Sequence, residues 1–182
     1  MEELNNQDNQ SNLLGSVLKP SDCASCKFCC SFRRQSLWET PVFPEDIMKK
    51  LQALFPAAKF RRAGQSGKSW TFDISDAYKT QDPEEEAKCP FLNDKNGCSL
   101  PPEIKPFDCK IWPLRAVQQE GLDKLVVVLT PTCPAINKVP VEKIRELAQG
   151  GLGKKIICYA QEHTDIIKPH SSFLSNIVYN GD

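Results

Sequence analysis

Nine cysteines carry most of the chemistry that this chain of 182 residues could perform. Three of them, Cys23, Cys26 and Cys29, are separated by two residues each within the run CASCKFCC. This spacing lets a short segment direct several sulfur atoms at one centre while backbone N–H groups point at the thiolates. The run therefore predicts metal ligation.

The remaining cysteines extend this prediction along the chain. Because neighbouring side chains diverge, Cys30 is expected to serve another face of a cluster, a second metal or the core. Four later cysteines stand in expected loops near proline or glycine, and proline reduces the conformational entropy lost when such loops converge. The spacing leaves open whether the candidates form one larger cluster or two four-thiolate sites. The predicted ligands are Cys23, Cys26, Cys29, Cys30, Cys89, Cys98, Cys109 and Cys133.

Several thiolates in one place require a cation, because a metal lowers their pKa and takes up the negative charge. Basic residues close to the ligands in sequence could offset the remaining charge, or they could be ordinary solvated surface charges. These residues are Lys27, Arg33, Arg34, Lys88 and Lys110.

Ligand type alone does not choose the metal, because soft thiolates suit zinc and iron–sulfur clusters alike. A C-x2-C-x2-C run with a distant Cys-Pro is closer to the ligation of a cubane cluster than to two separated zinc knuckles. We therefore expect an iron–sulfur cluster, with zinc as the alternative and a cysteine-rich fold without a stable metal as the third reading.

The ordered combination of CASCKFCC, CPFL, GCSL and KPFDCKIWP resembles the CxxCxxCC zinc- or iron-chelating family, also called the YkgJ family. The resemblance spans residues 23–133 and implies a multi-cysteine metal centre. Lys105 stands where that family often has Arg, and Trp112 where it often has Phe, so both keep the chemical type. Flagellin lysine methylases carry a similar cysteine arrangement associated with an iron–sulfur cluster, but no methyl-donor site is identified in this sequence.

Three residues are set apart from the predicted ligands. Cys158 lies between Ile157 and Tyr159 in an expected helix, and free cysteine is readily buried, so we expect it to pack in the core. His163 and His170 are far from the cysteines in sequence and are expected at the surface or at a helix end.

Composition narrows the class of protein. The chain is 40% hydrophobic and 25% charged, and 23 basic residues balance 23 acidic ones. Zero formal charge argues against a nucleic-acid or membrane partner, and no apolar run approaches a bilayer span of about 20 residues. Without a signal sequence, a cytoplasmic location is expected, where thiols stay reduced. The polar residues 1–20 predict a flexible tail, followed by a single cysteine-cluster domain over residues 21–182.

The elements expected to hold the cysteines alternate between helix and strand. Apolar spacing predicts helices over 44–55, from 141 and over 155–167, the last two separated by a glycine-rich break. Alternation predicts a hairpin of 58–63 with 68–74, and β-branched residues predict strands at 113–119 and 125–130.

We therefore expect an α+β fold, with a small antiparallel sheet, flanking helices and cysteine-rich loops around a metal centre. The sequence offers no Ser-His-Asp set, cofactor fingerprint or general base, so its status as an enzyme is open. The centre could be chemically active in redox chemistry, metal handling or another metal-dependent reaction. Alternatively, it could be a structural zinc site in a domain that binds a protein partner.

Overall fold

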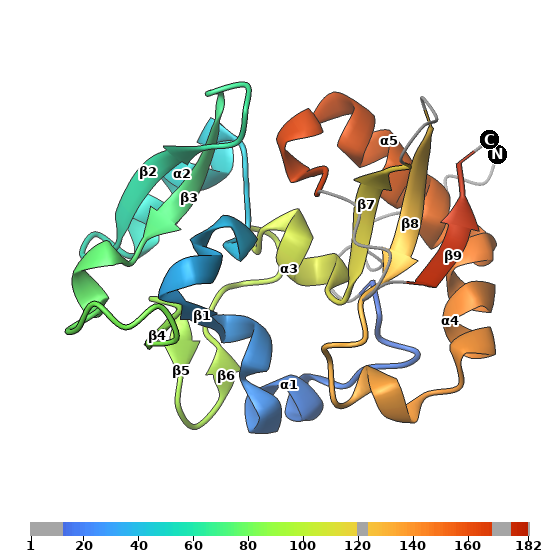
Figure 1. Cartoon of the computed structure of the whole chain (residues 1–182), viewed down its shortest axis with the longest axis horizontal. Helices are drawn as coiled ribbons and strands as arrows, with labels where there is room; N and C mark the ends of the chain where they lie inside the picture. The colour runs from blue at the N-terminus through green and yellow to red at the C-terminus, as the bar shows by residue number, and fades with distance from the viewer. Residues whose placement is uncertain (1–12, 120–123, 169–175, 182) are drawn as a thin grey trace, which may run out of the picture.

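The computed structural model describes residues 13–119, 124–168 and 176–181. It has the expected α+β composition, with helices and small antiparallel sheets (Figure 1). The α-helices are α1 (Pro20–Cys26), α2 (Glu45–Leu54), α3 (Phe107–Ile111), α4 (Val141–Leu147) and α5 (Gly153–Glu162).

The strands form one three-stranded sheet and three two-stranded ones. The larger sheet has the order β7-β8-β9, and the pairs are β1-β4, β2-β3 and β5-β6, all antiparallel. The bounds are β1 (Ser31–Arg33), β2 (Lys59–Ala63), β3 (Ser69–Asp73), β4 (Glu86–Lys88), β5 (Leu92–Asn93), β6 (Gly97–Cys98), β7 (Leu114–Gln118), β8 (Leu125–Leu129) and β9 (Asn176–Asn180).

Periodicity in the sequence locates most of the longer elements. The predicted helix 44–55 is α2, with Pro44 as its N-cap and Glu45 and Asp46 in its first turn, where acidic side chains favour the positive helix end. The predicted hairpin is β2-β3, and the two later strands are β7 and β8. The glycine break is a π-helical turn over Ala148–Leu152 between α4 and α5.

Two hydrophobic cores lie on either side of the cysteine-bearing segments. One packs α4 and α5 against the β7-β8-β9 sheet, on the right of Figure 1. The other is aromatic and lies under α2 and the β2-β3 hairpin, on the left, where the Phe72 and Phe91 rings meet edge to face at 5.9 Å. Segments α1, β5, β6 and α3 lie between and below them (Figure 1).

Residues 13–20, which the sequence predicts to be part of a tail, pack on the first core. Leu14 is 3% exposed and Leu18 is 9% exposed, both within that core. Burial of these leucines stabilises the segment and offsets the conformational entropy that is lost when the segment is ordered. The rest of the predicted tail, residues 1–12, lies outside the described residues.

Replacing Leu14 by Ala should therefore destabilise the protein by about 3 kcal/mol, since it removes buried apolar surface and leaves a cavity. The matched control is Leu54→Ala, because Leu54 is 57% exposed and its truncation should cost well under 1 kcal/mol. Urea unfolding of both variants measures the difference. Equal stability of the two variants would show that residues 13–18 contribute nothing to the core.

Candidate metal centre

Pairing of β1 with β4 joins the first cysteine run to the second. Ser31 lies opposite Lys88 in this antiparallel pair, and the Cys89 N–H donates to the Cys30 carbonyl oxygen at 2.8 Å. Two cysteines that are far apart in sequence are therefore neighbours at the end of a short ladder.

The β5-β6 hairpin adds Cys98 to this pair. Leu92 lies opposite Cys98, and the Leu92 N–H donates to the Cys89 carbonyl oxygen at 3.0 Å. Helix α1 packs against β6, and a Cβ at Gly97 would lie 2.9 Å from the Ala24 Cα. Gly97 also has a φ of +80°, so glycine is required here both for its conformation and for the close approach of α1.

Two further segments complete the group. Cys109 lies on α3, which follows Pro106 and ends before Pro113, a residue that cannot continue the helical hydrogen bonds. Cys133 is buried in a loop and packs with Cys23 on the first core, whereas Cys89 and Cys98 pack on the aromatic core. The cysteines therefore lie where the two cores meet.

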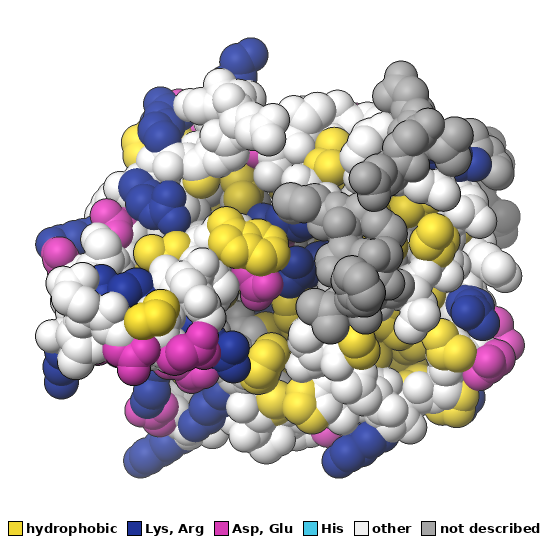
Figure 2. Space-filling view, viewed as in Figure 1, with side chains coloured by type: hydrophobic (Ala, Val, Ile, Leu, Met, Phe, Trp, Pro, Cys, Tyr) yellow, Lys and Arg dark blue, Asp and Glu magenta, His cyan; other side chains and the backbone are white. Residues whose placement is uncertain are grey.

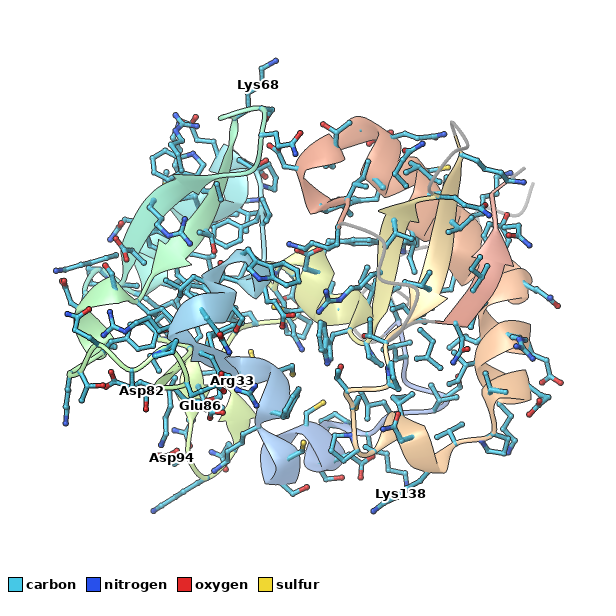
Figure 3. All side chains as sticks on the ribbon, in the orientation of Figure 1. Arg33, Lys68, Asp82, Glu86, Asp94 and Lys138 are labelled. Atoms are coloured by element: carbon cyan, nitrogen blue, oxygen red, sulfur yellow. The ribbon has the colours of Figure 1, made fainter. Side chains whose placement is uncertain are left out.

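All nine cysteines are free thiols, and seven are linked by mutual interactions. Cys29 is the hub of this network, because its charge acts on Cys23, Cys89 and Cys109. Cys30 joins through a side-chain hydrogen bond with Cys29, Cys98 through Cys89, and Cys133 through Cys23. We call these seven residues the thiol cluster. Several sulfur atoms are drawn around the blue segment that contains α1 in Figure 3.

The thiol cluster favours protonated sulfur in the absence of a cation. Burial, reinforced by neighbouring cysteines, raises the pKa of Cys23 to about 11 and that of Cys89 to about 12. Burial also raises the pKa of Cys109 well above its usual range, and the hydrogen bond with Cys30 raises that of Cys29. Charging these sulfurs together is therefore unfavourable unless a metal compensates.

Lys105 interacts electrostatically with four cysteines of the thiol cluster, and Lys168 interacts with Cys109. Burial acts to lower the pKa of Lys105, but the charges of Cys109, Cys98, Cys23 and Cys29 outweigh that effect and raise the pKa overall. One buried ammonium can offset part of the charge of several thiolates, but not all of it.

Four of the five basic residues singled out from sequence have carboxylate partners of their own. Lys27 and Lys88 both pair with Asp94, Arg34 pairs with Glu85, and Arg33 pairs with Glu84 and Glu86. Figure 3 labels Arg33, Glu86 and Asp94, and Figure 2 shows basic and acidic side chains next to each other on this side of the molecule. Closeness to the cysteines in sequence therefore did not identify Lys105 as a basic residue that interacts with them.

The structure places the predicted ligands unevenly. Cys26 is exposed at the end of α1 and is not part of the thiol cluster, whereas the other seven predicted ligands are. Cys30 interacts with Cys29, whose pKa it raises. Within the described ranges, no three Cys, His, Asp or Glu side chains lie close enough to hold one ion.

The thiol cluster still fits a soft metal by its donor chemistry. It offers free, partly desolvated sulfur atoms with no disulfide among them, and their mutual repulsion as thiolates is relieved by a bound cation. Ligation would require these side chains to converge further.

Cys158 does not pack in the core, contrary to expectation. It is exposed on α5, whereas Ile156, Ile157 and Ala160 of the same helix are buried. Cys158 is about 200° around the helix from Ile156, so it falls on the solvent face. His163 stacks on Tyr159 with ring centroids 4.3 Å apart, and His170 lies outside the described residues.

The carboxylate of Asp108, which was not singled out from the sequence, holds α3 in place through buried contacts. Asp108 accepts a hydrogen bond from the Val42 N–H at 3.0 Å, and Lys168 Nζ lies 3.9 Å from the same carboxylate. Nearby, Arg115 pairs with Glu39 at 3.7 Å and lies 4.4 Å from the centre of the Trp112 ring. Because Asp108 precedes Cys109, these contacts fix the segment that presents that thiol.

Comparison of the chain with protein-family models, curated proteins and solved structures finds no match in any of the three. The resemblance to the YkgJ family therefore rests on the cysteine motifs alone.

The hydrogen bond between Cys29 and Cys30 should be visible in thiol reactivity. In metal-free protein at neutral pH, iodoacetamide should label Cys29 more slowly than Cys158, although both are exposed, because a raised pKa leaves less reactive thiolate. Cys30→Ala should accelerate labelling of Cys29. Peptide mass spectrometry measures the rates, and faster labelling of Cys29 than of Cys158 would contradict the account.

Replacing Asp108 should loosen α3. Asp108→Ala removes the acceptor for Val42 and leaves buried Lys168 without its carboxylate, so a loss of about 3 kcal/mol is expected. Asp108→Asn keeps an acceptor oxygen and should cost less. Chemical denaturation compares the two variants, and equal losses would show that the hydrogen bond to Val42 contributes nothing.

Proposed function

We propose that the protein binds metal through the thiol cluster, in the form of an iron–sulfur cluster. The observation that carries this proposal is the network of free thiols from separate chain segments with Cys29 at its hub. The C-x2-C-x2-C run and the distant Cys-Pro pairs favour iron and sulfide over zinc.

The primary ligand set in this proposal is Cys23, Cys29, Cys89 and Cys109. Cys29 interacts electrostatically with each of the other three, which come from three separate segments of the chain. Cys30, Cys98 and Cys133 adjoin this set and would serve a second metal or a larger cluster.

When bound, an iron–sulfur cluster would supply one-electron transfer, as a redox centre or as part of a metal-dependent reaction. The protein's contribution would be to set the local charge and the exclusion of water. Lys105 adds positive charge next to the sulfurs and would favour the more reduced, more negative state. Asp108 would hold α3 so that Cys109 faces the centre.

A structural zinc site is the second candidate, and one observation favours it. Cys23 and Cys133 pack on one core, whereas Cys89 and Cys98 pack on the other, so a shared metal would tie the cores together. Metal binding would then contribute directly to the free energy of folding, and the domain would act by binding a protein partner.

No helix within the described ranges is long and apolar enough to cross a bilayer. Because nine free thiols persist only under reducing conditions, we propose the cytoplasm as the setting of this activity.

Two cysteine variants test the proposal. Cys29→Ser replaces the hub sulfur by a harder oxygen ligand and should abolish most metal binding and the visible thiolate-to-iron absorption. Cys158→Ser is the matched control and should keep both, because Cys158 is exposed on α5 outside the thiol cluster. Anaerobic purification followed by iron, sulfide and zinc analysis provides the readout.

Three outcomes separate the candidates. Iron with sulfide in wild type, lost in Cys29→Ser, supports the iron–sulfur proposal. Stoichiometric zinc without colour, after expression with ample iron, supports the structural alternative. Wild-type protein that folds and binds neither metal would refute both.

A further inference from the structure

A cleft of about 240 Å³ lies beside the thiol cluster. Its walls come from Leu13, from Ile47 of α2, from residues between Glu103 and Lys110, and from Lys155 and Tyr159 of α5. Ile47 belongs to the aromatic core, while Phe107 and Tyr159 pack on the other core. The cleft therefore opens at the junction of the two cores, a preferred place for ligand sites.

Three lysines give the lining of this cleft a net positive charge. Lys105, Lys110 and Lys155 line it, and Glu103 is the one acidic residue among its described lining residues. Lys105 and Lys155 both act electrostatically on Lys110, so the three ammonium groups share one field. Within the described part of the chain, none of the three makes an ion pair or a hydrogen bond, unlike the paired basic residues of the β1-β4 region.

Another wall of the cleft, which we call the aromatic wall, is formed by Phe107 and Tyr159. The Phe107 and Tyr159 rings stack with centroids 3.9 Å apart and planes inclined by 17°. Acidic residues near this wall are Asp108 on α3, Asp46 on α2 and Glu162 on α5, which act on Tyr159 but do not line the cleft. Because the stacked faces of the two rings cover each other and His163 also contacts the Tyr159 ring, the pair can offer a ligand ring edges and the outer face of Phe107. The cleft thus combines an aromatic surface with a cationic one.

We infer that this cleft binds a small phosphate monoester that carries a flat apolar group. Three lysines against one glutamate leave a net charge of +2 on the lining, which matches the charge of about −1.5 to −2 on a phosphate monoester at neutral pH. Phe107 and Tyr159 would contact the apolar group. A volume of about 240 Å³ is below the range of about 300–1,000 Å³ typical for drug-sized ligands, so the ligand is small.

A ligand in this cleft would extend the proposed function. The role of the ligand rests on the proposed metal centre, whereas its binding does not. Lys105 lines the cleft and also faces the thiol cluster, so a phosphate held there would lie next to the proposed metal centre. The bound compound would be a candidate substrate or effector of that centre.

Phenyl phosphate is the probe for this inference, with inorganic phosphate and benzoate as comparisons. Isothermal titration of the full chain as purified should give saturable binding of phenyl phosphate, about tenfold tighter than either comparison, because only this probe has both a dianionic head and a flat ring. Binding should weaken as ionic strength rises.

A pair of neighbouring lysines provides the matched variants. Lys155→Gln should weaken phenyl phosphate binding about tenfold, whereas Lys154→Gln should leave it unchanged, because Lys154 is exposed on the same helix and does not line the cleft. Circular dichroism and metal content, measured on each sample, should match wild type in both variants.

Four results would overturn the inference: no saturable binding, equal loss in both variants, an unchanged affinity in Lys155→Gln, or benzoate binding as tightly as phenyl phosphate. If anaerobically purified wild-type protein contains no metal but binds phenyl phosphate with this pattern, that result would support the cleft and refute the metal proposal. Metal-loaded protein that fails to bind phenyl phosphate would do the reverse.

Discussion

The repulsion between converging thiolates is the constraint on which the rest of the structure depends. The fold brings seven free cysteines together at the boundary of two hydrophobic cores. Burial and the charges of neighbouring cysteines raise the pKa of Cys23, Cys89 and Cys109 there. Lys105, a largely buried lysine, interacts electrostatically with four of the seven cysteines, and Lys168 interacts with Cys109. A metal would relieve this repulsion, and its absence would leave neutral thiols at the junction of two cores.

Much of the secondary structure could be predicted from local patterns. Helix α2, the β2-β3 hairpin and strands β7 and β8 each carry a clear periodicity, and long periodic segments depend little on their surroundings. Helix α1 and the two-residue strands β5 and β6 carry no such signal. Strand β9 was also missed, because a five-residue segment near the end of the chain is defined mainly by its pairing with β8.

The candidate site could be predicted only in part, because some of its contacts depend on long-range packing. Cysteine spacing indicates which residues could ligate, and seven of the eight predicted ligands lie in the thiol cluster. The exposure of Cys26 and Cys158 depends on the helix face that each occupies, which residue type alone does not determine. Lys105 and Asp108 owe their roles to long-range packing, so sequence neighbourhood favoured lysines and arginines that pair with other partners.

X-ray absorption at the metal edge, measured on anaerobically purified protein, tests the central claim most directly. The account predicts iron surrounded by sulfur alone, with a second-shell iron neighbour that identifies a cluster. A first shell of nitrogen and oxygen at a metal retained by the folded protein would contradict it, because the thiol cluster would then not be the ligand set.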